Sequence, residues 1–400
     1  MLEQILLAII IGCILGTITG ITPGIHINLV AALIFAASSL LLHYTNTTAL
    51  ITAITSMAIT HTFLDIIPST FLGAPNPDNA LSALPSHKLL LVGKSGEAIR
   101  IALAGSFFGL ITSAIFSPAI IYIVDMSYPV IKRYIAALLI GISIYTIQKS
   151  KSKTKSAFVF LLSGILGISV FSLKTLEQPL FPMLSGLFGI SSLIISLNTK
   201  TTIPLQEKIK SVVLGKISTI KNTMTSLISS VLTSFLPGLT SSHTTIIATA
   251  ISKSNEQKDY IFVNNSINTI SMMLSFVALF SIDKARNGAV VVISNFINNF
   301  TILHLALVIA SSLVAAFLAI ILCLKLSSKF AVHIMKINYS KLCKTIIIFL
   351  TILVLLLTGY IGIITLVTST FVGLIAKLFN IENTHLMGCL ILPVILYFLL

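Results

Sequence analysis

Apolar runs of about 18–25 residues follow one another along almost the whole chain, and this is the length that a helix needs to cross a bilayer. Of the 400 residues, 56% are hydrophobic and only 9% are charged. A soluble protein of this size could not bury so much apolar surface. The sequence therefore predicts an all-α polytopic membrane protein with about 12–14 membrane segments.

Hydropathy places these segments along the chain. The expected apolar segments are 3–20, 27–42, 47–72, 97–124, 130–148, 156–173, 179–198, 211–235, 241–252, 260–282, 288–323, 343–359, 361–379 and 384–400. The segment 288–323 is long enough to hold two helices.

Three lysine-rich loops separate some of these segments: 149–155, which reads KSKSKTK, then 199–221 and 325–344. Lysines in short loops mark the cytoplasmic side of a membrane protein. We therefore expect a multi-pass protein of the cell membrane whose N- and C-termini are both extracytoplasmic. The formal net charge of +14 then follows from membrane topology, and we expect no nucleic-acid partner.

A polar break interrupts the apolar pattern twice. The stretch GITPGIHINLVAALI (20–34) carries a Pro-Gly pair, and SFLPGLTSSHTTIIATAI (234–251) carries another. Small residues recur at every fourth position up to each pair: Gly12, Gly16, Gly20 and Gly24 in the first case, and Ser226, Ser230, Ser234 and Gly238 in the second. Such ladders allow two helices to approach closely, and a Pro-Gly pair then breaks the helix.

The matched breaks predict two inverted-topology repeats, each with a broken, re-entrant helical hairpin, as in many secondary transporters. We place the first membrane repeat at 1–198, a basic cytoplasmic linker at 199–221 and the second repeat at 222–400. Irregular backbone at membrane depth is tolerated only where it is buried in protein or lines a cavity. A single break would fit an ordinary proline kink, whereas two matched breaks favour paired hairpins.

The hairpins also predict a binding site for a small anion. Broken helices expose backbone N–H groups, which favour anions, and nearby hydroxyl and amide side chains add neutral hydrogen-bonding groups. The predicted substrate-binding residues are Pro23, Gly24, His26, Asn28, Pro237, Gly238, Thr240, Ser241, Ser242, His243, Asn264 and Asn265. The asparagines could instead only join helices by hydrogen bonds.

Asp65 is the deepest acid of the first half, and a carboxylate at membrane depth is costly unless it faces protein or water. We assign it to ion coupling, with Na⁺ or a proton as the ion; an interfacial acid at a helix end is the alternative. His61 lies one helical turn earlier on the same face and could hydrogen-bond Asp65 or simply pack. Asn268 lies four residues after Asn264 and extends a polar stripe.

No metal site or enzymatic motif stands out. The four cysteines form no CxxC pair and lie in or beside apolar segments, which is typical of buried thiols. The sequence lacks an HExxH zinc motif, and GKIST (215–219) lacks the glycines of a phosphate-binding loop. We expect no metal, no resident cofactor and no ATP-driven activity, and we expect that the chain is not an enzyme.

Several stretches in order resemble the large membrane subunit of the tripartite tricarboxylate transporters. They are GITPGIHINLVAALI, the region 65–109 that begins DIIPSTFLGAPNPDN, PLFPMLSGLFGI (179–190), FLPGLTSSHTTIIATAISKS (235–254) and NNSINTISMM (264–273). The chain resembles the shorter, archaeal-type members most. The resemblance implies sodium- or proton-driven symport of a di- or tricarboxylate held between the two hairpins. It also implies two partners, namely a small membrane subunit and an extracytoplasmic solute-binding protein.

Three other functions stay open at this point. A membrane-embedded hydrolase would need a convergent Ser/His pair, but the adjacent Ser241, Ser242 and His243 would point to different faces of a helix. A channel would conduct without saturation or coupling. A membrane scaffold would not need either Pro-Gly pair.

Overall fold

The computed structural model describes residues 2–22, 27–71, 83–176, 179–197, 204–207, 212, 214–234, 241–252, 256–285, 287–297, 299–334 and 339–400, and every regular element among them is helical. The elements are α1 (Leu2–Ile21), α2 (Ile27–Ala36), α3 (Ser38–Leu41), α4 (Thr47–Leu64), α5 (Ile66–Phe71), α6 (Ala83–Leu91), α7 (Ser95–Arg133), α8 (Ile135–Lys149), α9 (Lys153–Ser172), α10 (Leu180–Leu184), the π-helix η2 (Ser185–Ile190), α11 (Ser191–Leu197), α12 (Lys216–Ser234), α13 (Ser241–Ser252), α14 (Gln257–Ile282), α15 (Gly288–Phe296), α16 (Ile302–Ile334), α17 (Tyr339–Leu378), the 3-10 helix η3 (Asn383–Met387) and α18 (Gly388–Leu399).

The predicted all-α polytopic architecture is confirmed. In the described part of the chain, seven helices are long and apolar enough to cross a membrane, and three shorter apolar helices accompany them. The expected segment 288–323 contains two helices, α15 and α16. The expected break near residue 360 is a kink at Gly359, where φ is 66°. α12 begins at Lys216, within the range expected for the linker.

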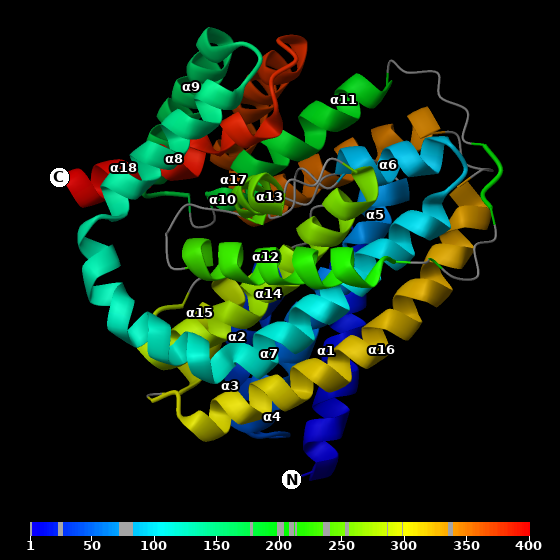
Figure 1. The fold of residues 1–400 in the computed structure, drawn as a ribbon, viewed down its shortest axis with the longest axis vertical. Helices are drawn as coiled ribbons and strands as arrows, with labels where there is room; N and C mark the ends of the chain where they lie inside the picture. The colour runs from blue at the N-terminus through cyan, green and yellow to red at the C-terminus, as the bar shows by residue number, and fades with distance from the viewer. Residues whose placement is uncertain are drawn as a thin grey trace.

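The helices pack as two bundles (Figure 1). Bundle A comprises α1–α7 and α12–α16, whereas bundle B comprises α8–α11 with η2, α17, η3 and α18. Each bundle therefore draws helices from both sides of the predicted linker. The apolar core of bundle A continues into bundle B through Ile190, Leu193 and Leu366, so side chains without polar groups join the two bundles.

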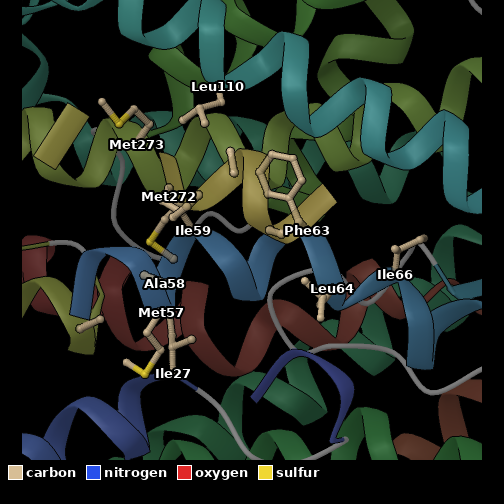
Figure 2. Packing of buried hydrophobic residues seen from close by; sticks show 14 of the residues in the cluster. Ile27, Met57, Ala58, Ile59, Phe63, Leu64, Ile66, Leu110, Met272 and Met273 are labelled. Carbon is tan, nitrogen blue, oxygen red and sulfur yellow. The ribbon is translucent and has the colours of Figure 1, made fainter. Parts of the chain in front are cut away.

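α4 lies at the centre of bundle A and is buried along its whole apolar window. Figure 2 shows Ile59 of α4 beside Met272 of α14, and Met57 on the opposite side of α4 beside Ile27 of α2. Around this helix pack α1, α14 and α16. A helix enclosed by protein on all sides does not need a lipid-facing stripe, and this lets α4 carry polar residues at membrane depth.

The glycine ladder on α1 brings that helix against the backbone of α4, as its spacing predicts. A Cβ built on Gly16 would lie 2.5 Å from the Met57 carbonyl oxygen, and one on Gly12 would overlap the Ala53 carbonyl. Gly105 of α7 meets the Phe262 carbonyl of α14 in the same way. These close approaches fix the central helices without large side chains between them.

In bundle B, the segment near residue 186 packs against α17, and the segment near residue 388 packs against α9. Gly186 in η2 packs against α17, where its Cβ would lie 2.5 Å from the Leu366 carbonyl oxygen and 2.7 Å from Ser369. Gly388 at the start of α18 packs against Phe160 and Ser163 of α9. The step from Phe160 to Leu366 equals the step from Ser163 to Ser369, so the same contact is built twice with the halves exchanged.

A short part of the linker docks on the turn between α6 and α7. The Gln206 amide donates to the Leu90 carbonyl at 3.1 Å and accepts from the Ser95 N–H at 3.1 Å. The Glu207 N–H donates to the Gly93 carbonyl at 2.8 Å. Gly93 has a φ of +83°, which an L side chain rarely adopts. The linker therefore ties the start of the second half to the base of α7.

Candidate functional site

Among the described acidic and basic side chains of bundle A, that of Asp65 is the most deeply buried, and it lies where α4 and α14 cross. The Asn268 amide of α14 donates to Asp65 Oδ2 at 2.8 Å, and the two side chains are 6% and 2% exposed. Beside them, the Thr269 hydroxyl donates to Thr62 Oγ1 at 3.2 Å. Asp65 follows the last residue of α4, so the carboxylate sits at a junction between two helices. A buried carboxylate needs such donors, because leaving it unpaired is strongly unfavourable.

Two further helices supply groups around this crossing. His61 Nδ1 lies 3.1 Å from Thr19 Oγ1 of α1, so this histidine contacts α1. The Cys323 thiol of α16 is close enough to interact electrostatically with the Asp65 carboxylate. Groups from α1, α4, α14 and α16 thus lie around the acid, which is buried in protein at the end of α4. Its depth in the membrane stays a prediction.

A second polar group links α12, α13 and α14. The Thr245 hydroxyl of α13 donates to Asn264 Oδ1 at 3.0 Å, and the Thr233 and Thr244 hydroxyls lie 2.6 Å apart. Asn264 is fully buried, and its Nδ2 has no hydrogen-bond partner among the described residues. Asn265 donates instead to the Ile261 carbonyl of its own helix at 2.7 Å. Asn264 therefore presents an amide donor inside the bundle, whereas the Asn265 amide is used within α14.

Asn28 connects the two halves near the first predicted hairpin. Its Oδ1 accepts a hydrogen bond from the Ala289 N–H at 3.1 Å, at the first turn of α15. Its Cβ lies 2.8 Å from the position that a Cβ of Gly288 would take, so a larger residue than glycine would not fit there. The hydrogen bond holds α2 against a helix that lies far away in the sequence.

Most of the predicted hairpin residues are not among those that the structure describes. Pro23, Gly24, His26, Pro237, Gly238 and Thr240 lie outside the described residues, as do the side chains of Ser242 and His243. Ser241 is the first residue of α13. The described helices flank both Pro-Gly pairs, since α1 ends at Ile21 and α12 at Ser234. The hairpin site itself stays a prediction.

Comparison with known proteins identifies the family. The profile of the "Tripartite tricarboxylate transporter TctA family" matches residues 6–388, which is nearly the whole chain. The chain belongs to the TctA family. The match confirms the resemblance that the ordered motifs indicate, and it places the chain in a transporter family.

A relative of similar length aligns with this TctA chain almost from end to end. The chain is 33% identical over 407 residues to the "Uncharacterized protein MJ1079" of Methanocaldococcus jannaschii, and the alignment covers 98% of this chain and 99% of that protein. No solved structure matches the chain.

Sequence reasoning identifies Asp65, Asn264 and Asn265 in this TctA chain but does not pair them. Asn268, the partner of Asp65, was recognised only as part of a polar stripe; its spacing of four from Asn264 is the signal that places both on one face of α14. The partners Thr62 and Thr245 carry no such signal, because threonine is common in apolar helices. Within the described residues, no group of three or more His, Cys, Asp or Glu side chains could hold a metal ion.

Proposed function

We propose that the chain is the membrane-embedded permease of a secondary transport system, which moves a small organic anion across the cell membrane. The substrate class is a di- or tricarboxylate. The observation that supports this most directly is the hydrogen bond between Asp65 and Asn268, which joins distant parts of the chain inside bundle A. An ionisable group at that depth is retained at a cost and points to a transport function.

The substrate is held between the two Pro-Gly hairpins in this proposal. Three features of the second half support the choice: the amide donor of Asn264 without a partner among the described residues, the hydroxyls of Thr244 and Thr245, and the N-terminus of α13 at Ser241. Backbone N–H groups at a helix start favour a carboxylate by charge and by geometry. Neutral donors then complete the site without a permanently charged side chain, which lets the substrate leave again.

Asp65 carries the coupling ion, either a proton or Na⁺. The carboxylate is enclosed by α1, α4, α14 and α16, so a bound cation at this position changes the charge that all four helices surround. The Asn268 amide stabilises the ionised form by donating to Oδ2. Binding of a cation weakens that hydrogen bond, and the contact between the halves thereby depends on the ion.

Movement of bundle A relative to bundle B provides alternating access. Helices pack mainly within their own bundle, and apolar side chains such as Ile190 and Leu193 form the contact between bundles. An interface without directional hydrogen bonds can shift at little energetic cost. Asp65, Asn264 and the flanks of both hairpins all belong to bundle A, so the substrate and the ion travel together.

The proposed orientation puts the lysine-rich turn between α8 and α9 in the cytoplasm and both chain ends outside. The partners are a small membrane subunit and an extracytoplasmic protein that delivers the solute. Family membership supports both, because the name of the family describes a three-part system.

Uptake by proteoliposomes tests the proposal. The purified chain, alone and with its co-purifying subunits, is assayed for accumulation of radiolabelled di- and tricarboxylates driven by a sodium or a pH gradient. Asp65→Asn should abolish gradient-driven accumulation and keep exchange of labelled for unlabelled substrate, because exchange does not need net ion movement. Glu97→Gln, which removes a carboxylate that pairs with Lys258 near the end of bundle A, serves as the control and should keep both activities.

Two results would contradict the proposal. If Asp65→Asn keeps full gradient-driven accumulation, Asp65 does not carry the coupling ion. If uptake is linear with substrate concentration and no carboxylate stabilises the purified protein, the chain is a channel or a scaffold rather than a permease.

A further inference from the structure

The turn between α8 and α9 presents four lysines on the surface of bundle B. Lys149, Lys151, Lys153 and Lys155 are all exposed, and we call them the α8–α9 basic cluster. None of them forms an ion pair with another described residue, whereas Lys258 of bundle A pairs with Glu97 at 2.5 Å. The cluster is therefore a concentrated and uncompensated positive charge, and such a charge requires an anionic partner or a full shell of water.

Aromatic side chains hold the two ends of the basic cluster. Lys149 Nζ lies 5.3 Å from the ring centre of Tyr145, and Lys155 Nζ lies 5.2 Å from that of Phe379. The rings of Phe158 and Phe379 are 6.3 Å apart, which joins α9 to the residue that follows α17. These cation–π contacts fix two ammonium groups at the level of the rings.

Exposed rings lie on both helices that flank the cluster, Tyr145 on α8 and Phe158 on α9. Phe158 is 51% exposed and Tyr145 is 44% exposed, and Ile144 beside Tyr145 is 53% exposed. α9 is long and apolar enough to cross a membrane, and a bilayer around it would bring hydrocarbon against the exposed Phe158 near its start. The basic cluster thus sits directly above lipid-facing apolar side chains, which is where the phosphates of a bilayer lie.

We propose that the α8–α9 basic cluster binds the phosphate-bearing headgroups of anionic lipids and fixes bundle B to that leaflet. The ammonium groups neutralise the phosphates, and the exposed aromatic rings pack against the upper part of the acyl chains. A soluble acidic protein would match the charge but would leave Phe158 and Ile144 without an apolar partner. The lipid is therefore the occupant that satisfies both the charge and the exposed rings.

Bundle A provides a matched control surface at the same end of the molecule. The Lys377 ammonium of α17 donates to Ser192 of α11, and α11 leads into the linker that docks on Gly93, so the two bundles share this end. Lys88, Lys94, Lys216 and Lys221 are also exposed there. Their neighbourhood contains acids, among them Glu97, Glu207 and Asp259, the last of which accepts from Asn222 at 2.8 Å. This surface and the α8–α9 basic cluster each carry four exposed lysines, but the nearby acids lower the net positive charge of the bundle A surface.

Lipid titration of the purified protein tests the proposal without any transport assay, so its outcome is independent of the proposed function. The protein is placed in phosphatidylcholine nanodiscs, phosphatidylglycerol is added in steps, and the lipid concentration for half-maximal thermal stabilisation is measured. One variant changes all four lysines of the cluster to glutamine, and a second changes them to arginine. The control variant changes Lys88, Lys94, Lys216 and Lys221 to glutamine.

Each lysine near an anionic surface contributes roughly a fivefold effect on lipid affinity, and mutual screening reduces the total. We expect the glutamine variant to lose at least about tenfold in phosphatidylglycerol affinity. The arginine and control variants should stay within about twofold of the wild type. Soluble glycerol phosphate should give no stabilisation, because it has no acyl chain for the rings to contact.

Three results would overturn the proposal: equal phosphatidylglycerol affinity in the glutamine variant and the wild type, an equal loss in the control variant, or full stabilisation by glycerol phosphate, which would indicate a free-phosphate site. If the fourfold variant does not fold, the pair Lys151→Gln and Lys153→Gln replaces it. Neither of these lysines contacts an aromatic ring among the described residues, and the pair should still lower the affinity at least about fivefold.

Discussion

The repeated glycine contacts of bundle B make a sharp prediction about stability. Gly167 of α9 faces the backbone of α18, and a Cβ built on it would overlap the Cys389 carbonyl. Gly167→Ala must therefore push two packed helices apart, since a carbonyl cannot rotate away as a flexible side chain can. Gly141 of α8 has nothing within 4 Å of the same position, so Gly141→Ala meets open space.

The magnitudes follow from this difference. Overpacking by one methyl group in a tight core costs about 1–3 kcal/mol. Replacing glycine by alanine in an exposed helix gains up to about 1 kcal/mol from backbone entropy alone. Both glycines lie in helices, so the backbone gain is common to the two variants and the overpacking cost sets the difference. We therefore expect Gly167→Ala to be about 1–3 kcal/mol less stable than Gly141→Ala, a gap of about 1–4 °C in Tm for a chain of this length. Gly373→Ala, which meets the Leu187 carbonyl from the other half, should behave like Gly167→Ala.

Thermal unfolding of the purified protein in one detergent, followed by tryptic resistance or by aggregation of a fluorescent fusion, measures the three variants side by side. If Gly167→Ala and Gly141→Ala differ by less than about 1 °C, the close approach of α9 and α18 does not exist as described. A drop in Gly373→Ala without one in Gly167→Ala would refute the idea that the two contacts are equivalent.

Four further outcomes follow from the same structure. Asn268→Leu should lower stability by about 1.5–3 kcal/mol, because it removes the donor to a buried carboxylate, and a double-mutant cycle with Asp65→Asn should show coupling between the two positions. Gln206→Ala should cost about 1 kcal/mol and make the linker more sensitive to limited proteolysis, since two hydrogen bonds to the α6–α7 turn are lost. All four cysteines are buried and should resist a membrane-impermeant maleimide until the protein is denatured. Burial lowers the pKa of His87 in α6 below its usual 6.5, and the hydrogen bond to the Thr70 carbonyl opposes this effect only in part. The unfolded state therefore binds more protons, so stability should fall as the pH drops below 6.5. A plot of Tm against pH should be flatter for His87→Gln than for the wild type.

The sequence predicts the helices of this protein well, because bilayer-length hydropathy depends on local composition alone. The break near residue 360 and the division of 288–323 were both visible in that pattern, as Gly359 and the gap between α15 and α16 confirm. The ladder of small residues predicts the close approach of α1 as well. Gly12 and Gly16 lie one helical turn apart on one face of an apolar helix, where small residues allow a second helix to approach closely.

The partners of these helices were not predictable from the sequence. The pairing of Gly105 with Phe262, or of Asn268 with Asp65, joins residues of opposite halves, and nothing in the local pattern selects one apolar helix over another as a neighbour. The packing of η2 on α17 and of α18 on α9 likewise joins residues that lie far apart in the sequence. The contacts of Gly186 and Gly388 show it in the structure, and no local pattern predicts it.

Asp65 and Asn268 bring unlike side chains together where two helices from distant parts of the chain meet. The Asn46 amide donates to Gln4 Oε1 between α4 and α1, and the Ser218 hydroxyl donates to Asp259 Oδ1 between α12 and α14. α4 and α14 then meet at Asp65 and Asn268. Two carboxylates at such a crossing would repel each other, and two amides would carry no charge. An acid at the end of α4 and an amide on α14 give the crossing a single carboxylate with a fixed donor, so Asn268→Asp should destabilise the protein more than Asn268→Leu by placing a second carboxylate against the first.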